Sequence, residues 1–441
     1  MIDWTAVATE IARLAQDAPP ARLLSVTVPL PHLPAIALGD DWVCWQRPDR
    51  NVRLLGIGKA FNATSAGAGR FAALHAAQRG LMEGWRHDHD MPPPLAFTGF
   101  AFASEGGAPL PNASLWVPEL LLREQADSVT LTLSCAADQA EAALPRWQAL
   151  WNKPAQHFAA SPAPSFLHTN PLADEAFLAR GRAALAAITT GGIDKLVLTR
   201  SVRLKAGAPL APGPLLAELA AHHPACAVFG VGHAGAVFAG ASPETLLALR
   251  GDRVEVDALA GTAWQDAARA LGDDKNRREH DFVARAVVDA LAELCADVTV
   301  PDAPEVMQLE ALTHLRRRVT ARRPPDVGAL DLVARLHPTP AVGGAPTPAA
   351  LDWLARHNDL RGAWYTGGIG WIDAAGDCDI AVALRCGLFQ GHTATLYAGA
   401  GFVAGSDPEQ EFAETEAKFA AMRAAIVASS AAAATAREEA A

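Results

Sequence analysis

The chain has 441 residues, a formal net charge of −11, 50% hydrophobic residues and 19% charged residues. A chain of this length can bury a large core, in one large domain or in two to three ordinary ones. The negative charge argues against nucleic acid or an anionic membrane surface as the main partner, and any anionic substrate would need local positive charge or a metal ion to bind.

The cysteines and the hydropathy pattern predict a cytoplasmic protein. The six cysteines are scattered without a Cys-x-x-Cys pair, which is typical of reduced thiols rather than of a disulfide framework or a zinc knuckle. The N-terminus lacks the basic segment and apolar core of a signal peptide. No run approaches 18 apolar residues, so we expect no membrane span.

The first 165 residues mix short β-like runs with alanine-rich helical stretches. Strands are predicted at residues 23–28 and 129–133 and a helix at 71–79. Prolines punctuate the segment, the last of them at Pro162 and Pro164.

The pattern is clearer from residue 174 onwards. A helix is predicted at 174–188, then a strand at 195–198, a hairpin of strands 227–232 and 236–239, and a strand at 254–260. The glycine pattern Gly230–Gly235 falls in this hairpin and is therefore interpreted as a turn, because a dinucleotide site would need a helix after it.

The C-terminal part contains two strongly amphipathic helices. One is predicted at 275–298 and the other at 408–427, where Asp407, Pro408 and Gln410 form a variant of the capping box. Strands are predicted between them at 364–371, 379–383 and 393–399, and the alanine-rich tail 428–441 is expected to fray. Strands that follow one another directly favour an α+β, mostly antiparallel architecture.

Acidic residues on these two helices are candidate metal ligands. Glu279 extends the apolar stripe of its helix, although a charge at a helix N-terminus is an equally simple explanation. On the last helix Glu411, Glu414 and Lys418 share one face, and Glu414–Lys418 taken alone is an ordinary surface pair. Two glutamates from separate helices, completed by water and a substrate carboxylate, would suit Mg²⁺.

Three further sites have simple alternatives. Lys195 begins an apolar strand and could be a charged residue that protects a sheet edge. Glu244 follows a hairpin strand and could be an ordinary polar turn residue. The run His87–Asp90 has metal-ligand side chains, but a triple proline follows and an exposed loop is expected.

Taken together, these residues resemble the chorismate-utilising enzymes, which include isochorismate, salicylate, anthranilate and aminodeoxychorismate synthases. The resemblance covers roughly residues 165–425. It rests on an ordered series of motifs: Asp194–Arg200, Phe238–Glu244, Ala260–Thr262, Arg278–His280, His314–Leu315, Leu336–Gly344, Tyr365–Trp371, Ala383–Cys386, Gly399–Gly401, Glu411–Thr415 and Lys418.

The resemblance implies one α+β fold, in which two large, mainly antiparallel sheets pack orthogonally and are flanked by helices. Residues 1–165 would then be the N-terminal part of that fold, 166–427 the chorismate-binding catalytic region, and 428–441 the tail.

Two positions resemble isochorismate synthases rather than the relatives that add ammonia. Anthranilate synthases generally have glutamine where Lys195 stands, whereas a lysine can act as a general base on water. Aminodeoxychorismate synthases use a nucleophilic lysine in the motif that here reads His337–Ala341, and salicylate synthases typically show a threonine-containing variant of it.

The roles implied by the resemblance follow these motifs. Lys195 would be the general base that activates water at ring carbon 2, and Glu244 the general acid that protonates the hydroxyl leaving carbon 4. The implied Mg²⁺ ligands are Glu279 and Glu414, with Glu411 contributing through water. The implied substrate-binding residues are Arg385, Gly399, Gly401, Lys418, Ala341, His337 and Thr262; a guanidinium suits the pyruvyl carboxylate.

The expected activity is therefore the Mg²⁺-dependent conversion of chorismate to isochorismate, for menaquinone or siderophore synthesis. A monomer without an amidotransferase subunit is implied. The alternatives are a salicylate or anthranilate synthase of the same family, or a non-catalytic chorismate-binding protein.

Overall fold

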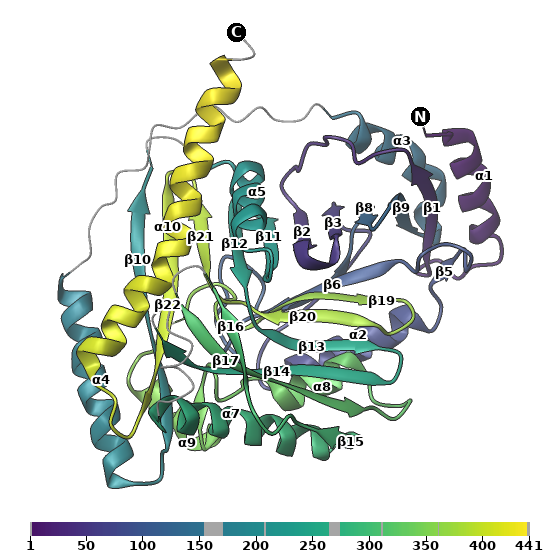
Figure 1. Ribbon diagram of the computed structural model, residues 1–441. Coiled ribbons are helices and arrows are strands. Elements are labelled where there is room, and N and C mark those ends of the chain that lie inside the picture. Colours follow the sequence, from purple (N-terminus) through teal and green to yellow (C-terminus); the bar gives the residue numbers. More distant parts are fainter. Residues whose placement is uncertain are drawn as a thin grey trace.

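Two large antiparallel sheets form the centre of the protein, and helices cover their outer faces (Figure 1). The computed structural model describes residues 2–153, 171–206, 209–263, 274–309, 312–359 and 361–438. In Figure 1 the strands of the second sheet run across those of the first. The predicted α+β class and the predicted two-sheet architecture are confirmed.

The first sheet has twelve strands among the described residues, all antiparallel to their neighbours except the last pair. Their spatial order is β18 (Gly344–Ala345), β10 (Lys195–Lys205), β22 (Thr393–Val403), β21 (Cys386–Gln390), β12 (Ala236–Ser242), β11 (Ala227–His233), β2 (Trp42–Arg47), β3 (Val52–Ile57), β8 (Leu120–Gln125), β9 (Ser128–Ala136), β1 (Leu23–Leu30) and β5 (Arg86–His87).

The second sheet is also antiparallel throughout the described residues. Its order is β15 (Ala296–Thr299), β17 (Thr313–Arg322), β14 (Arg253–Ala263), β13 (Thr245–Arg250), β20 (Cys378–Val382), β19 (Gly368–Asp373), β6 (Leu95–Phe100), β7 (Ala113–Val117) and β4 (Phe61–Ser65), while β16 (Glu305–Gln308) also pairs with β17. Strands from the first 153 residues therefore extend both sheets.

The described helices are α1 (Trp4–Ala15), α2 (Arg70–Met82), α3 (Ala140–Trp151), α4 (Pro171–Thr190), α5 (Pro212–His222), α7 (Asp274–Ala292), α8 (Ala329–Leu336), α9 (Thr347–Arg356) and α10 (Pro408–Glu438). Three of the apolar clusters fill the space between neighbouring layers. One packs α1, α3, α5 and α10 on the first sheet, a second packs α2, α7 and α8 on the second sheet, and a third lies between the sheets. Helices α4 and α9 cover β10 and β22.

Local sequence explains where these helices form. Asp3 caps α1, because its carboxylate accepts hydrogen bonds from the backbone N–H groups of Thr5 and Ala6 at 3.0 Å. In α7 the residues Val283, Val287 and Leu291 recur every four positions and are buried at 0–1% exposure, so the helix presents one apolar face to the second sheet.

Some predicted element ends are wrong. Helix α7 ends at Ala292 instead of 298, since the β-branched residues that follow pair with β17 as β15. The strand predicted at 364–371 begins only at Gly368, after a turn in which Ala363 and Thr366 have positive φ.

Helix α10 also ends later than predicted. It runs past Val427 to Glu438, where the sequence had indicated a frayed tail. Alanine has the highest helix propensity, and the hydroxyls of Ser429 and Ser430 donate to the carbonyl of Ile426, so this segment continues the helix without an apolar stripe.

Several smaller predictions concern loops and thiols. The 227–239 hairpin is confirmed, with Ala234 and Gly235 in its turn, and Asp88 to Asp90 are exposed. All six cysteines are free thiols. The boundary predicted at 165, with Pro162 and Pro164, lies outside the described residues. None of the described helices has the length and apolar character needed to cross a membrane.

Candidate active site

A polar cleft lies where the chain passes from the first sheet to the second. Pro243 and Glu244 make that passage between β12 and β13. The cleft is lined by nine of the candidate residues, drawn from β14, α7, β22, α10 and the intervening turns: Glu244, Thr262, Glu279, Ala341, Arg385, Gly399, Gly401, Glu414 and Lys418. Segments that are far apart in sequence therefore converge on one cavity.

Lys195 lies directly behind the cleft wall. It is the first residue of β10 and pairs with β18 on one side and β22 on the other, so this end of β10 is not a sheet edge. Its side chain is 1% exposed, and Nζ lies 3.1 Å from Oε1 of Glu279. This ion pair lacks hydrogen-bond alignment, and the amine has no hydrogen-bond partner among the described residues. The edge-protection interpretation is wrong.

Glu244 is a buried carboxyl group that faces the cleft. The residue is 2% exposed, and its Oε1 has no hydrogen-bond partner in the part of the chain that the structure describes. Burial, reinforced by the nearby carboxylate of Asp257, raises the pKa of Glu244 to about 8, despite the opposing positive charge of Lys195. The group therefore carries a proton at neutral pH, as a general acid must.

Glu414 is held from two sides. The hydroxyl of Thr262 donates to Oε1 of Glu414 at 3.1 Å, and Lys418 Nζ donates to the same oxygen at 2.5 Å. Lys418 also donates to the carbonyl of Gly399 at 2.7 Å, which ties α10 to β22. The pair is only 12–16% exposed, so it is not an ordinary surface pair.

Arg385 is oriented by a histidine whose role the sequence analysis missed. Its Nη2 donates to Nε2 of His314 at 2.9 Å, so Nδ1 of His314 carries the proton and points to the carbonyl of Gly261 at 3.3 Å. Burial and the neighbouring guanidinium lower the pKa of His314 to about 3 and keep the ring neutral. His314 stands in a quoted motif, but no spacing rule connects it with Arg385.

The two glycines of β22 leave room for these side chains. A Cβ on Gly401 would lie 2.2 Å from Oε1 of Glu279 and 3.2 Å from Cε of Lys195. A Cβ on Gly399 would lie 2.9 Å from the carbonyl of Leu198. A larger residue at 401 would therefore displace the carboxylate of Glu279.

Two candidate residues are not brought to the cleft. His337 packs among phenylalanine rings and donates from Nε2 to the carbonyl of Phe102 at 3.1 Å; burial lowers its pKa to about 3. Glu411 is buried at 2% exposure in the first turn of α10 and does not line the cleft. Among the described residues no group of three acidic, histidine or cysteine side chains is arranged to hold a metal ion directly. The contribution of Glu411 through water stays a prediction.

The remaining pair of carboxylates fits a divalent cation. Glu279 and Glu414 reach the same cleft from α7 and α10, and both can offer carboxylate oxygens as metal ligands. Mg²⁺ typically binds one or two protein carboxylates and keeps positions for water and substrate oxygens, so two glutamates suffice.

Residues 10–427 match the family described as chorismate binding enzyme. The chain belongs to the chorismate-binding enzymes. Members of the isochorismate synthase family need a divalent metal ion. The match covers both sheets and all of the cleft residues named above.

Named relatives within the chorismate-binding family point to one reaction. The chain is 29% identical to isochorismate synthase MenF of Bacillus subtilis strain 168 over 409 residues, 87% of either chain. It is 37% identical to the salicylate biosynthesis isochorismate synthase of Pseudomonas aeruginosa over 252 residues, 55% of this chain and 53% of that one. The structure of Escherichia coli MenF, the menaquinone-specific isochorismate synthase, superposes with a TM-score of 0.77 at 25% identity, covering 96% and 99% of the two chains.

Proposed function

We propose that this protein is an isochorismate synthase, an isomerase that converts chorismate to isochorismate for menaquinone or siderophore biosynthesis. The observation that carries the proposal is the buried carboxyl group of Glu244, whose pKa is raised to about 8, in the same cleft as Arg385 and Glu279. Lys195 Nζ lies 3.1 Å from the carboxylate of Glu279. The chain thus supplies an acid, a base and an anion-binding group around one cavity.

The two proton-transfer residues match the two halves of the reaction. Lys195 takes a proton from water as the water oxygen bonds to ring carbon 2, and the double bonds shift around the ring. The bond between carbon 4 and its hydroxyl then breaks, and Glu244 donates the proton that lets the hydroxyl leave as water. One water enters and one leaves, so the reaction is an isomerisation without a redox cofactor.

The binding groups offset the charge of the substrate. Chorismate is a dianion and the protein has net charge −11, so local cations must hold it. Arg385 would bind the pyruvyl carboxylate, and Lys418 and Thr262 fix the wall on which the ring carboxylate rests. Mg²⁺ held by Glu279 and Glu414 would neutralise that ring carboxylate and orient the ring.

The remaining parts of the proposal concern the state of the protein in the cell. We place it in the cytoplasm as a monomer, without an amidotransferase subunit, a nucleic acid or a membrane as partner. The negative charge argues against nucleic acid and membrane partners, and the six free thiols are typical of a reducing compartment. Salicylate or anthranilate synthesis is the alternative, and Lys195 favours water over ammonia as the nucleophile.

A product assay tests the function directly. The purified protein is incubated with chorismate and Mg²⁺, with and without ammonium. The products are separated by chromatography, because an isomer has the same mass as chorismate, and are then identified by mass. We expect a product isomeric with chorismate under both conditions, lost in Lys195→Ala. Loss of pyruvate, or an aminated product only with ammonium, would overturn the proposal in favour of a lyase or an ammonia-using relative.

A further inference from the structure

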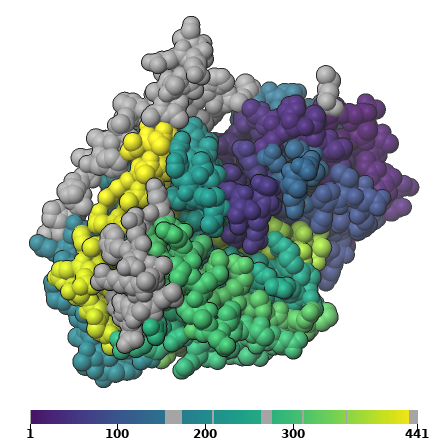
Figure 2. Space-filling model, in the orientation of Figure 1, coloured from purple at the N-terminus to yellow at the C-terminus, as the bar shows by residue number. Residues whose placement is uncertain are grey.

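A second cavity lies against the other side of Arg385. It has a volume of about 290 Å³ and runs between α5 and α10, which lie side by side at the surface (Figure 2). Its lining is almost entirely apolar: Leu219, Cys226, Ala241, Leu309, Leu312, Met422 and four alanines of α10, with His223 and Arg385 as the polar members. Such a volume is at the lower end of the range for small-molecule pockets.

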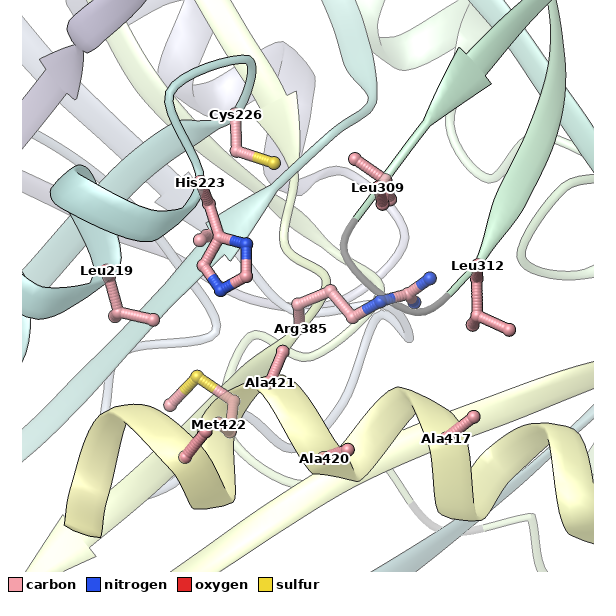
Figure 3. Close-up of a pocket in the computed structure, with 12 residues that line it drawn as sticks. Leu219, His223, Cys226, Leu309, Leu312, Arg385, Ala417, Ala420, Ala421 and Met422 are labelled. Carbon is pink, nitrogen blue, oxygen red and sulfur yellow. The ribbon is translucent and has the colours of Figure 1, made fainter. Parts of the chain in front are cut away.

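Arg385 gives this cavity its chemical character. Figure 3 shows its guanidinium extending between Leu309 and Leu312 on one side and the alanines of α10 on the other. Among the described residues Arg385 makes no ion pair, and it donates a hydrogen bond to the neutral ring of His314. A largely buried cation that lacks a direct ion-pair partner among the described residues favours an anionic ligand.

We propose that this cavity binds a small apolar carboxylic acid, with its carboxylate on Arg385 and its hydrocarbon body against Leu219, Leu312 and Met422. The apolar wall selects a ligand with one or two rings and few polar groups, because each polar atom placed there would lose its hydrogen bonds to water. Chorismate, a dianion with a hydroxyl, does not suit this lining.

The shared arginine couples the two cavities. Arg385 lines both the cleft and the apolar cavity, so one guanidinium serves a carboxylate from either side. An acid bound here therefore competes with the substrate carboxylate for Arg385 and raises the KM for chorismate without lowering kcat. This consequence rests on the proposed function, whereas binding of the acid does not.

Binding is tested with 1-naphthoate as the probe, by calorimetry on the full-length protein without chorismate. We expect binding, with the neutral 1-naphthamide at least about tenfold weaker, because the amide lacks the charge-assisted contact to Arg385. Ala421→Leu and, independently, Ala424→Leu fill the cavity and should each weaken naphthoate binding about tenfold or more. Ala186→Leu, at an exposed position of α4, is the matched control and should leave binding unchanged.

Each outcome of these binding experiments either supports or overturns the proposed acid site. Equal affinity for naphthoate and its amide, or unchanged naphthoate binding in both cavity-filling variants, would overturn the proposal, the latter by placing the acid in the cleft. Absence of naphthoate binding to the unmodified protein would overturn it too. If naphthoate binds as expected but the protein does not convert chorismate, the proposed function fails and the apolar acid site stands.

Discussion

The side chain of Glu244 is buried, so water does not solvate its carboxyl group. The residue is 2% exposed, and the carboxylate of Asp257 is held nearby by the backbone N–H of Thr245 at 3.1 Å and by Arg318 at 3.2 Å. Both effects disfavour ionisation of Glu244. The acid of the proposed reaction is thus prepared by the fold before the substrate arrives.

The pH dependence of the reaction should report this group. Since Glu244 must be protonated to act as an acid and its pKa is raised to about 8, kcat/KM for chorismate should fall above a midpoint near pH 8. Glu244→Gln should lower kcat by roughly 10²–10⁴-fold. Glu255→Gln, in the same sheet but outside the cleft, is the control. A rate that stays constant to pH 10 in the unmodified protein would contradict the assignment.

Stability should depend on the same proton. The pKa of Glu244 is raised in the folded protein, so its protonated carboxyl group makes its full contribution to the free energy of unfolding below the ordinary pKa of 4.5. That contribution is lost as the pH rises through about 8. Relative to Glu244→Gln, the free energy of unfolding should therefore fall between these pH values, by up to roughly 4–5 kcal/mol. Urea titrations of both proteins at pH 5, 7 and 9 measure this, and parallel pH profiles would refute it.

Gly401 tests the metal site without removing a ligand. A Cβ there would lie 2.2 Å from Oε1 of Glu279, so Gly401→Ala should move that carboxylate and weaken Mg²⁺ binding by about 10–100-fold, as changes around metal ligands typically do. Calorimetric titration with Mg²⁺ is the measurement. Gly80→Ala is the control, since a Cβ at position 80 meets nothing within 4 Å. Equal Mg²⁺ affinities in all three proteins would show that Glu279 is not a ligand.

At the scale of the element, Arg200 of β10 docks α10 against the first sheet. Its Nε donates to the hydroxyl of Thr415 at 2.6 Å, it forms ion pairs with Asp174 and Glu416, and its guanidinium lies 4.0 Å from the ring centre of Phe412. The side chain is 4% exposed. The position of α10, and with it that of Glu414 and Lys418, depends on these contacts.

Removal of this arginine should affect both stability and catalysis. We expect Arg200→Ala to lower the free energy of unfolding by about 3 kcal/mol, because it leaves Asp174 without this ion pair, removes one of the two arginine partners of Glu416 and breaks the hydrogen bond to Thr415. It should also raise the Mg²⁺ concentration needed for half-maximal activity. Arg182→Ala removes a 61% exposed partner of Glu409 and should change stability by under about 1 kcal/mol. If the two variants were equally stable, the docking role of Arg200 would be wrong.

Sequence periodicity could predict elements but not all of their ends. The spacing of Val283, Val287 and Leu291 fixed the buried face of α7, yet where that helix stops depends on pairing between β15 and β17, which are separated in sequence. The sequence left Glu244 and Lys195 each with an alternative, purely structural interpretation, because the burial of a side chain is a property of the assembled fold. The resemblance to a family assigned both residues to one site. The role of His314 was not predicted, because its contact with Arg385 joins residues that are far apart in sequence.

At the scale of the whole molecule, the N-terminal and C-terminal halves share their core. The cluster between the sheets joins Trp45 and Phe97 from the first half to Phe229 and Phe238 from the second. Arg47 of β2 forms a buried ion pair of 2.5 Å with Asp379 of β20, which links one sheet to the other. Both sheets of the described structure contain strands from both halves.

The chain should therefore unfold as one cooperative unit. A polypeptide of residues 166–441 would lack β2 and β6, the partners of β11 and β19, and would expose Phe229, Phe238 and the inner faces of both sheets. We expect this fragment to lose near-ultraviolet circular dichroism and to bind a hydrophobic dye, while the full chain melts in a single calorimetric transition. If the fragment instead melted sharply and bound Mg²⁺ on its own, residues 1–165 would be a separate domain. The structure of the cleft would then not depend on the N-terminal strands.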